Sequence, residues 1–224
     1  MRWGKTMGML LVLLVLAASC GEAESELPMS FDAYPTMEVR TDRAYTYSAI
    51  FTTSVGRMTF NLNPQEATLA VNSFMFLSLE GFFDDLVIYR VLPGVLAETG
   101  DPTGTGTGGP GYTFEVEPPH RAYARGDLVM AHDGSPNSNG SRFFILFGDI
   151  AGNADLPGQY TIVGSLKEGH KPSARTLATL EAVALGPGPD GEVSMPVDTV
   201  QLTTVAVSRG CPPSSSTSYS SLCK

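Results

Sequence analysis

One arginine, Arg90, lies in the middle of an apolar run that spans residues 86–96 (LVIYRVLPGVL). A guanidinium is permanently charged and carries five N–H donors in a fixed plane. Beside an apolar surface it can hold a carbonyl oxygen through these donors. The alternative is an ordinary surface arginine on a strand. The sequence around Arg90 decides between the two interpretations.

Three blocks of sequence contain or follow Arg90 in a fixed order. They are residues 82–94 (FFDDLVIYRVLPG) with 100–112 (GDPTGTGTGGPGY), residues 128–131 (LVMA) with 136–145 (PNSNGSRFFI), and residues 156–164 (LPGQYTIVG). In order and spacing these blocks resemble the cyclophilin-type peptidyl-prolyl isomerases, with one extra residue near Ser135. The resemblance extends from residue 45 to residue 207, and it favours the catalytic interpretation of Arg90.

The resemblance implies an enzyme that accelerates rotation about Xaa-Pro bonds, which has a barrier of about 20 kcal/mol. Such a catalyst must bind the twisted amide more tightly than either planar form. Arg90 matches the family's catalytic arginine, which holds the prolyl carbonyl and donates toward the prolyl nitrogen. The family uses no cofactor, metal or covalent intermediate. Its implied partners are proline-containing polypeptides.

A proline ring needs an apolar pocket beside that arginine. The family forms this pocket from Phe, Met, Phe and Leu, and the matching positions here are Val95, Leu96, Phe144 and Leu156. Val95 replaces a large ring, so we expect a wider floor that binds proline less tightly by about 1–2 kcal/mol. Because strand side chains alternate, Phe143 is expected to point the opposite way from Phe144, into the interior.

Two charged residues stand where the family has glutamines, Glu98 and Arg142. The first of those glutamines orients the catalytic arginine in the family. Our hypothesis is that Glu98 and Arg142 form an ion pair across the groove. Alternatively, Glu98 binds Arg90 directly and holds it away from substrate, which would weaken the activity.

Three further residues match the wall and edge of the family's peptide groove. Ala131 and His132 fall on the segment whose backbone pairs with bound peptide, and Tyr160 falls on the groove wall. We interpret His132 as a groove-edge residue and not as a metal ligand, so no metal site is predicted.

The pattern of the chain predicts a mainly β fold. Helical spacing of apolar residues follows a predicted start at Asn63, and Gly81 ends this helix; a second helix is predicted over residues 173–182. Short strands are predicted at residues 45–54, 57–62, 86–91, 96–98, 112–115, 127–132, 143–147, 161–166 and 199–207. This pattern suits a barrel or a sandwich. The resemblance selects a closed eight-stranded antiparallel cyclophilin-like barrel capped by two α-helices.

The first residues have the pattern of a bacterial lipoprotein signal. Arg2 and Lys5 precede a short apolar run, and small residues lead to Cys20. We expect residues 1–19 to be removed, Cys20 to be lipidated, and the protein to be exported to the bacterial cell envelope, with its anchor on a periplasmic or extracellular membrane face. An ordinary secretory signal is the alternative. Residues 20–36 are predicted as a flexible tether, residues 37–209 as the cyclophilin-like domain, and residues 210–224 as a Ser-rich tail.

Two cysteines remain, Cys211 and Cys223 in that tail. They are candidates for a disulfide in an oxidising compartment, and two free thiols are the alternative. Removing Arg2 and Lys5 with the signal changes the formal net charge from −9 to −11. A surface this acidic argues against nucleic-acid partners and against binding to anionic lipid headgroups.

The sequence therefore favours a lipid-anchored prolyl isomerase, which we expect to be a monomer, assisting the folding of exported proteins. An alternative is a proline-peptide-binding module with little or no activity, because Val95, Glu98 and Arg142 depart from the family pattern. A third interpretation is a structural surface lipoprotein that retains only the scaffold.

Overall fold

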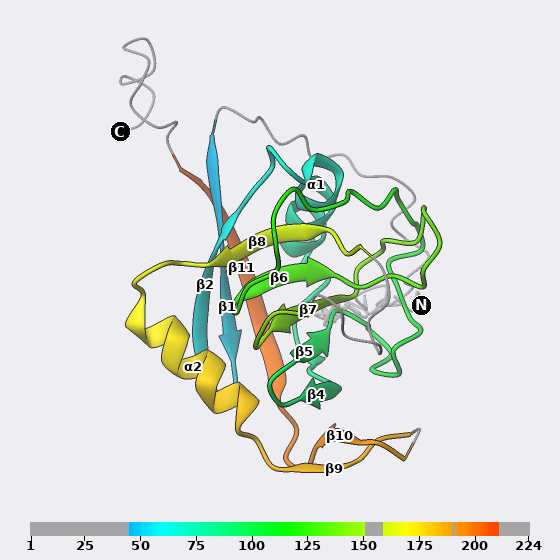
Figure 1. Cartoon of the computed structure of the whole chain (residues 1–224), viewed down its shortest axis with the longest axis vertical. Helices are drawn as coiled ribbons and strands as arrows, with labels where there is room; N and C mark the ends of the chain where they lie inside the picture. Colours follow the sequence, from blue (N-terminus) through cyan, green and yellow to red (C-terminus); the bar gives the residue numbers. More distant parts are fainter. Residues whose placement is uncertain (1–44, 151–158, 190, 211–224) are drawn as a thin grey trace, which may run out of the picture.

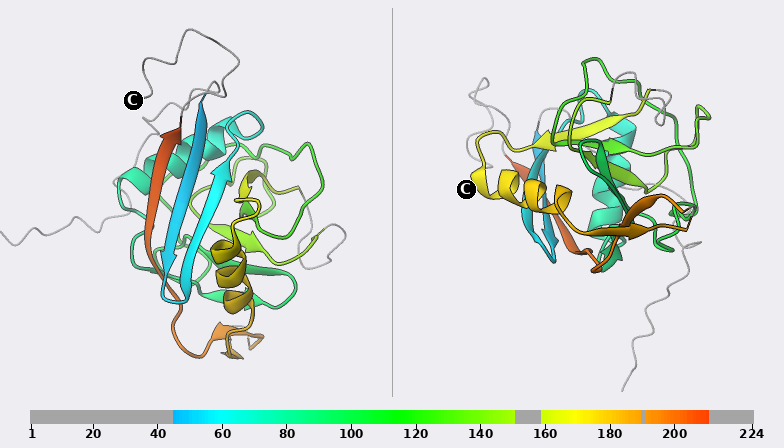
Figure 2. Two further views of the ribbon diagram at one scale, coloured as in Figure 1. Left: turned by 90° about the vertical axis from the view of Figure 1, so that its left-hand side faces the viewer. Right: turned by 60° about the horizontal axis from the view of Figure 1, so that its bottom comes forward.

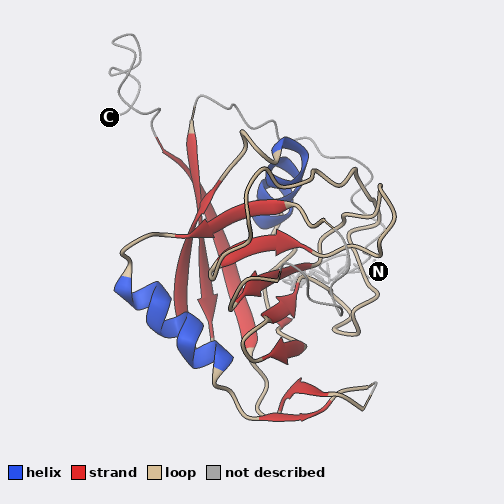
Figure 3. Ribbon diagram, in the orientation of Figure 1, coloured by secondary structure: helices blue, strands red, loops and turns tan. Residues whose placement is uncertain are grey.

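The computed structural model of the chain describes residues 45–150, 159–189 and 191–210. Within these ranges the fold is a curled antiparallel sheet accompanied by two helices (Figures 1 and 3). The helices are α1 (Thr68–Leu79) and α2 (Lys171–Glu181). Neither of these two described helices is long and apolar enough to cross a membrane.

Nine strands form the main sheet, in the order β3-β11-β1-β2-β8-β6-β7-β5-β4. Their bounds are β1 (Thr46–Thr53), β2 (Gly56–Leu62), β3 (Leu86–Val87), β4 (Arg90–Leu92), β5 (Leu96–Thr99), β6 (Asp127–Met130), β7 (Phe143–Leu146), β8 (Ile162–Leu166) and β11 (Gln201–Gly210). Every neighbouring pair is antiparallel. The long strands β11, β1 and β2 lie side by side in the left view of Figure 2.

The predicted closed eight-stranded barrel is not what the structure shows. The sheet is open, with β3 and β4 at the two ends of the strand order. The sequence predicted one strand over residues 86–91, but the chain divides there, because Ile88 donates to Val200 whereas Tyr89 donates to Glu98. The two halves consequently pair with different partners, β3 with β11 and β4 with β5.

The first helix begins later than predicted. The residues after Asn63 form turns, and α1 starts at Thr68 without a side-chain cap from its preceding residue. The carboxylate of Glu117, from a distant loop, instead accepts hydrogen bonds from the amides of Leu69 and Ala70. Gly81, with φ 69°, follows the end of the helix as predicted.

Other predicted elements agree closely with the structure. The hairpin of β1 and β2 turns at Gly56, and α2 buries Leu177 and Leu180. No strand forms at residues 112–115, where Phe114 makes only an isolated bridge to Asn139. A second, two-stranded sheet of β9 (Leu185–Pro187) and β10 (Val193–Pro196) was not predicted.

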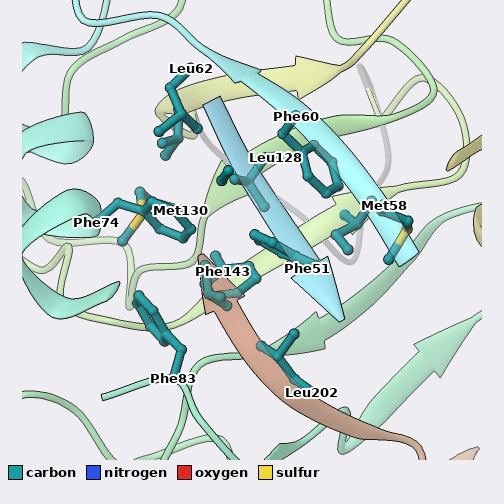
Figure 4. Close-up of a cluster of buried hydrophobic side chains, with 14 of the residues drawn as sticks. Phe51, Met58, Phe60, Leu62, Phe74, Phe83, Leu128, Met130, Phe143 and Leu202 are labelled. Atoms are coloured by element: carbon teal, nitrogen blue, oxygen red, sulfur yellow. The ribbon is translucent and has the colours of Figure 1, made fainter. Parts of the chain in front are cut away.

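The main core fills the inside of the curled sheet (Figure 4). Phe143 lies at its centre, with ring centroids 5.6 Å from Phe51, 5.6 Å from Phe74 and 5.3 Å from Phe83. Leu128 and Met130 of β6 reach the same cluster. Alternate residues of these strands therefore face away from the core, where they can build a second surface.

Candidate active site

A second buried cluster lies on the opposite face of β5, β6, β7 and β8. Its members are Leu96, Val129, Ala131, Phe144, Leu146, Ile150, Tyr160 and Ile162, with Val95 and Tyr123 packed against it at partial burial. Phe143 and Phe144 thus belong to different clusters, as the alternation predicted. Four predicted pocket or wall residues, Leu96, Ala131, Phe144 and Tyr160, meet in this second cluster, and Val95 lies at its margin.

Strand register places Arg90 on the same face. Arg90 of β4 lies opposite Glu98 of β5, Glu98 lies opposite Phe144 of β7, and Phe144 lies opposite Val129 of β6. Directly opposed residues share a sheet face, so Arg90 stands two strands, roughly 10 Å, from Phe144. The guanidinium and the apolar cluster therefore border one surface.

Glu98 lies between two arginines. Its carboxylate is 3.6 Å from the Arg90 guanidinium and 3.9 Å from that of Arg142. The Glu98–Arg142 proximity agrees with the hypothesis of a pair across the groove, and the alternative contact with Arg90 is present as well. Both separations exceed hydrogen-bonding distance, so neither arginine holds the carboxylate alone.

Arg142 stands between two cavities. It lines one of about 510 Å³ with the 107–113 loop and another of about 230 Å³ with Arg90 and Glu98. Its guanidinium donates to the carbonyl oxygen of Gly106. The Tyr89 hydroxyl is buried near the Glu98 carboxylate. Burial, and then the nearby Glu98 carboxylate, raise the pKa of Tyr89, so the phenol stays neutral.

The glycine-threonine loop between β5 and β6 is organised by one buried side chain, that of Asp101. Its carboxylate accepts hydrogen bonds from the amides of Thr103, Thr105, Thr107 and Gly108. Burial opposes ionisation, but the hydrogen bonds outweigh it and lower the pKa of Asp101. This loop forms one wall of each cavity.

At the edge of the cluster, the rings of His132 and Tyr160 contact each other with centroids 4.5 Å apart and a tilt of 32°. The Gly134 amide donates to His132 Nδ1, which leaves Nε2–H to donate to the Gln159 carbonyl at 3.1 Å. The Tyr160 ring meets the Phe144 ring edge-on at 5.3 Å, and burial raises the pKa of its hydroxyl. Both ring nitrogens of His132 are thus engaged by backbone groups.

No group of three or more His, Cys, Asp or Glu side chains that could hold a metal occurs in the described part of the chain.

The Ala131 amide donates to the Arg142 carbonyl, which joins the groove edge to the residue before β7. Leu156, Cys20, Cys211 and Cys223 lie outside the described residues.

The sequence analysis missed one residue at the site, Glu192. Its carboxylate lies 3.4 Å from the Arg90 guanidinium, on the side that faces the β9–β10 hairpin. The segment 188–192 (GPDGE) carries a Pro-Asp-Gly turn signal between two short extended runs, which would have indicated a hairpin. Its contact with Arg90, 102 residues away, had no signal in the sequence.

Comparison with known proteins agrees with this geometry. The family model described as cyclophilin type peptidyl-prolyl cis-trans isomerase/CLD matches residues 48–207. A peptidyl-prolyl cis-trans isomerase of Helicobacter pylori is 35% identical over 158 residues, covering 69% of this chain and 91% of the relative. A probable peptidyl-prolyl cis-trans isomerase B of Mycobacterium leprae is 39% identical over 166 residues, but the match covers only 52% of that longer protein. A crystal structure of a Cryptosporidium parvum cyclophilin type isomerase superposes with a TM-score of 0.63 at 30% identity, covering 73% of this chain and 98% of that one.

Proposed function

Because the chain belongs to the cyclophilin-type peptidyl-prolyl cis-trans isomerase family, we propose that Arg90 and the second apolar cluster form its isomerase site. The family assigns the chain an isomerase activity on proline-containing polypeptides. The observation that supports this site is the register row Arg90–Glu98–Phe144, in which the arginine and a member of the second apolar cluster share one face of the sheet.

In this proposal the proline ring packs against Phe144 and Leu96, with Val95 at the rim. Arg90 holds the prolyl carbonyl and donates to the prolyl nitrogen when amide resonance is broken. The hydrogen bond to the prolyl nitrogen exists only in the twisted state, so it lowers the barrier and does not merely tighten binding. The family resemblance predicts Leu156, which lies outside the described residues, as a further pocket residue.

Exchange NMR on a short Xaa-Pro peptide tests the role of Arg90. We expect Arg90→Ala to lower kcat/KM about 100-fold or more, because it removes the donor that the twisted amide needs. Arg209→Ala is the matched control, since Arg209 is an exposed arginine on β11 that lies over the Tyr45 ring. Equal exchange rates for wild type and Arg90→Ala would refute the proposed site. Peptide line broadening without faster exchange would instead support a binding module.

We also propose that the enzyme is exported, is anchored through Cys20, and accelerates proline-limited folding steps of exported proteins. The support is the lipoprotein pattern of residues 1–20. In cells that make the full chain, wild type should sediment with membranes and incorporate labelled fatty acid. Cys20→Ser should do neither, and a Cys20→Ser variant that still carries label would contradict lipidation at this residue.

A further inference from the structure

The β9–β10 hairpin lies beside β4, the strand that carries Arg90 (Figure 1). Val193 and Pro187 are opposed in its register, as are Met195 and Gly186, and the register shifts between these two pairs. Its end is closed by a hydrogen bond from the Gly188 amide to the Glu192 carbonyl. The hairpin is therefore a hydrogen-bonded element placed next to the site.

Side chains of β10 and the residue after it alternate between two environments. Ser194 and Pro196 are buried, whereas Val193, Met195 and Val197 are 61%, 44% and 64% exposed. Among the described residues, the other exposed large apolar side chain is Leu79, at 60%. Three of four such residues thus form a single stripe, and a gathered apolar stripe marks an interaction surface more often than scattered residues do.

This stripe is continuous with the proposed site. Met195 and Pro189 line the 230 Å³ cavity whose other wall includes Arg90, Glu98 and Arg142. Met195 therefore belongs both to this cavity and to the exposed stripe of β10.

We propose that Val193, Met195 and Val197 form a second substrate-binding surface, which holds apolar side chains of the same polypeptide a few residues from its proline. This inference rests on the proposed function. The spacing fits, because the stripe repeats every second residue and so do the side chains of an extended polypeptide. The chemistry fits too, since unfolded chains awaiting proline isomerisation expose apolar side chains. The enzyme would thereby favour unfolded segments over proline-containing loops with polar flanks.

The test compares two peptides of equal length around one Ala-Pro bond. One carries leucines two to four residues from the proline on both sides, and the other carries serines at those positions. For wild type we expect kcat/KM to be about five- to tenfold higher for the leucine peptide, because its KM is lower by that factor. Val193→Ser/Val197→Ser should reduce that ratio to within about twofold of unity, because it removes the apolar contact area. Leu79→Ser, an exposed apolar residue on α1, should preserve the wild-type ratio.

A wild-type ratio near one, or a ratio that survives the double substitution, would overturn the proposal. If wild type catalyses neither peptide, the proposed function fails, and the hairpin is tested by binding alone. Titrating the leucine peptide should then shift the methyl resonances of Val193 and Val197, and unmoved methyls refute the surface. If wild type sediments as a dimer that the double substitution dissociates, the stripe binds a second copy. If wild type binds phospholipid vesicles and the double substitution abolishes this binding, the stripe binds lipid. Either result also overturns the proposal.

Discussion

At the scale of single residues, the charge balance around Arg90 depends on Glu98. The carboxylate is buried and approaches both Arg90 and Arg142, and Glu192 approaches Arg90 from the hairpin side. The guanidinium groups of Arg90 and Arg142 repel each other when the Glu98 carboxylate between them is neutralised. We therefore favour a positioning role for Glu98, in place of the inhibitory role that the sequence left open.

Replacing Glu98 with Gln tests this role. We expect kcat/KM to fall about three- to tenfold in Glu98→Gln, because Arg90 and Arg142 then repel without an intervening negative charge. Glu98→Gln/Arg142→Gln should recover most of the activity, since it removes the repulsion and restores the pair of neutral amides typical of the family. The measurement is exchange NMR on one short Xaa-Pro peptide. Higher activity in the single variant would show that Glu98 restrains Arg90.

The residues of the site differ in how well the sequence predicts them. Phe143 and Phe144 were assigned to opposite faces because strand periodicity is a local rule. The charges of Glu98 and Arg142 suggested their contact as one of two alternatives, and the structure contains both. Glu192 could not be found in this way, because its contact depends on how a separate hairpin packs against β4.

At the scale of elements, the loop after β5 depends on the ionised form of Asp101. Its hydrogen bonds lower the pKa in the folded state below the ordinary value of 3.8. The stabilisation is therefore complete above the unfolded-state pKa and is lost as the pH falls through the lower folded-state pKa. The carboxylate thus contributes a part of the unfolding free energy that disappears only in acid.

Asp101→Asn should show this directly. We expect the free energy of unfolding at pH 7 to fall by about 1–3 kcal/mol, because an amide accepts fewer and weaker hydrogen bonds from the loop. The loss should shrink when urea unfolding is repeated at successively lower pH below 3.8, where the wild-type carboxylate also becomes neutral. A difference between the two proteins that stays constant down to the lowest pH would contradict the assigned ionisation.

Elements were predicted best where local pattern decides them. The β1–β2 hairpin follows from alternation and the glycine turn, and α2 follows from its apolar spacing. The start of α1 was wrong by five residues, from Asn63 to Thr68, because Glu117 caps the helix from 48 residues away in sequence. A cap supplied by tertiary contact leaves no trace in the helix's own sequence.

At the scale of the whole molecule, one sheet separates two apolar clusters with different tasks. Phe143→Ala should lower the free energy of unfolding by about 3–5 kcal/mol, because it opens a cavity among the core rings. At low temperature, where Phe143→Ala is folded, its KM for an Xaa-Pro peptide should stay within about twofold of wild type. Phe144→Ala should raise that KM about tenfold. Urea unfolding and exchange NMR measure the two effects. An equal rise in KM for both variants would mean that the two faces are not independent.

The class of the fold, mainly β with two helices, was predictable because short strands and well-spaced helices leave strong local patterns. Closure of the sheet was not predictable in this way, since it depends on whether residues 86–92 pair as one strand or as two. A two-residue interruption at Ile88 and Tyr89 changes the strand count without changing the local pattern.

An open sheet can raise the tendency of a protein to self-associate. β4 ends the strand order, and an uncovered terminal strand offers free backbone groups on which another chain can assemble into aggregates. Here β10 packs alongside it, with Ser194 and Pro196 buried and a proline that cannot donate to a further strand. The small hairpin thus occupies space beside the terminal strand and limits the room for a further strand from another chain.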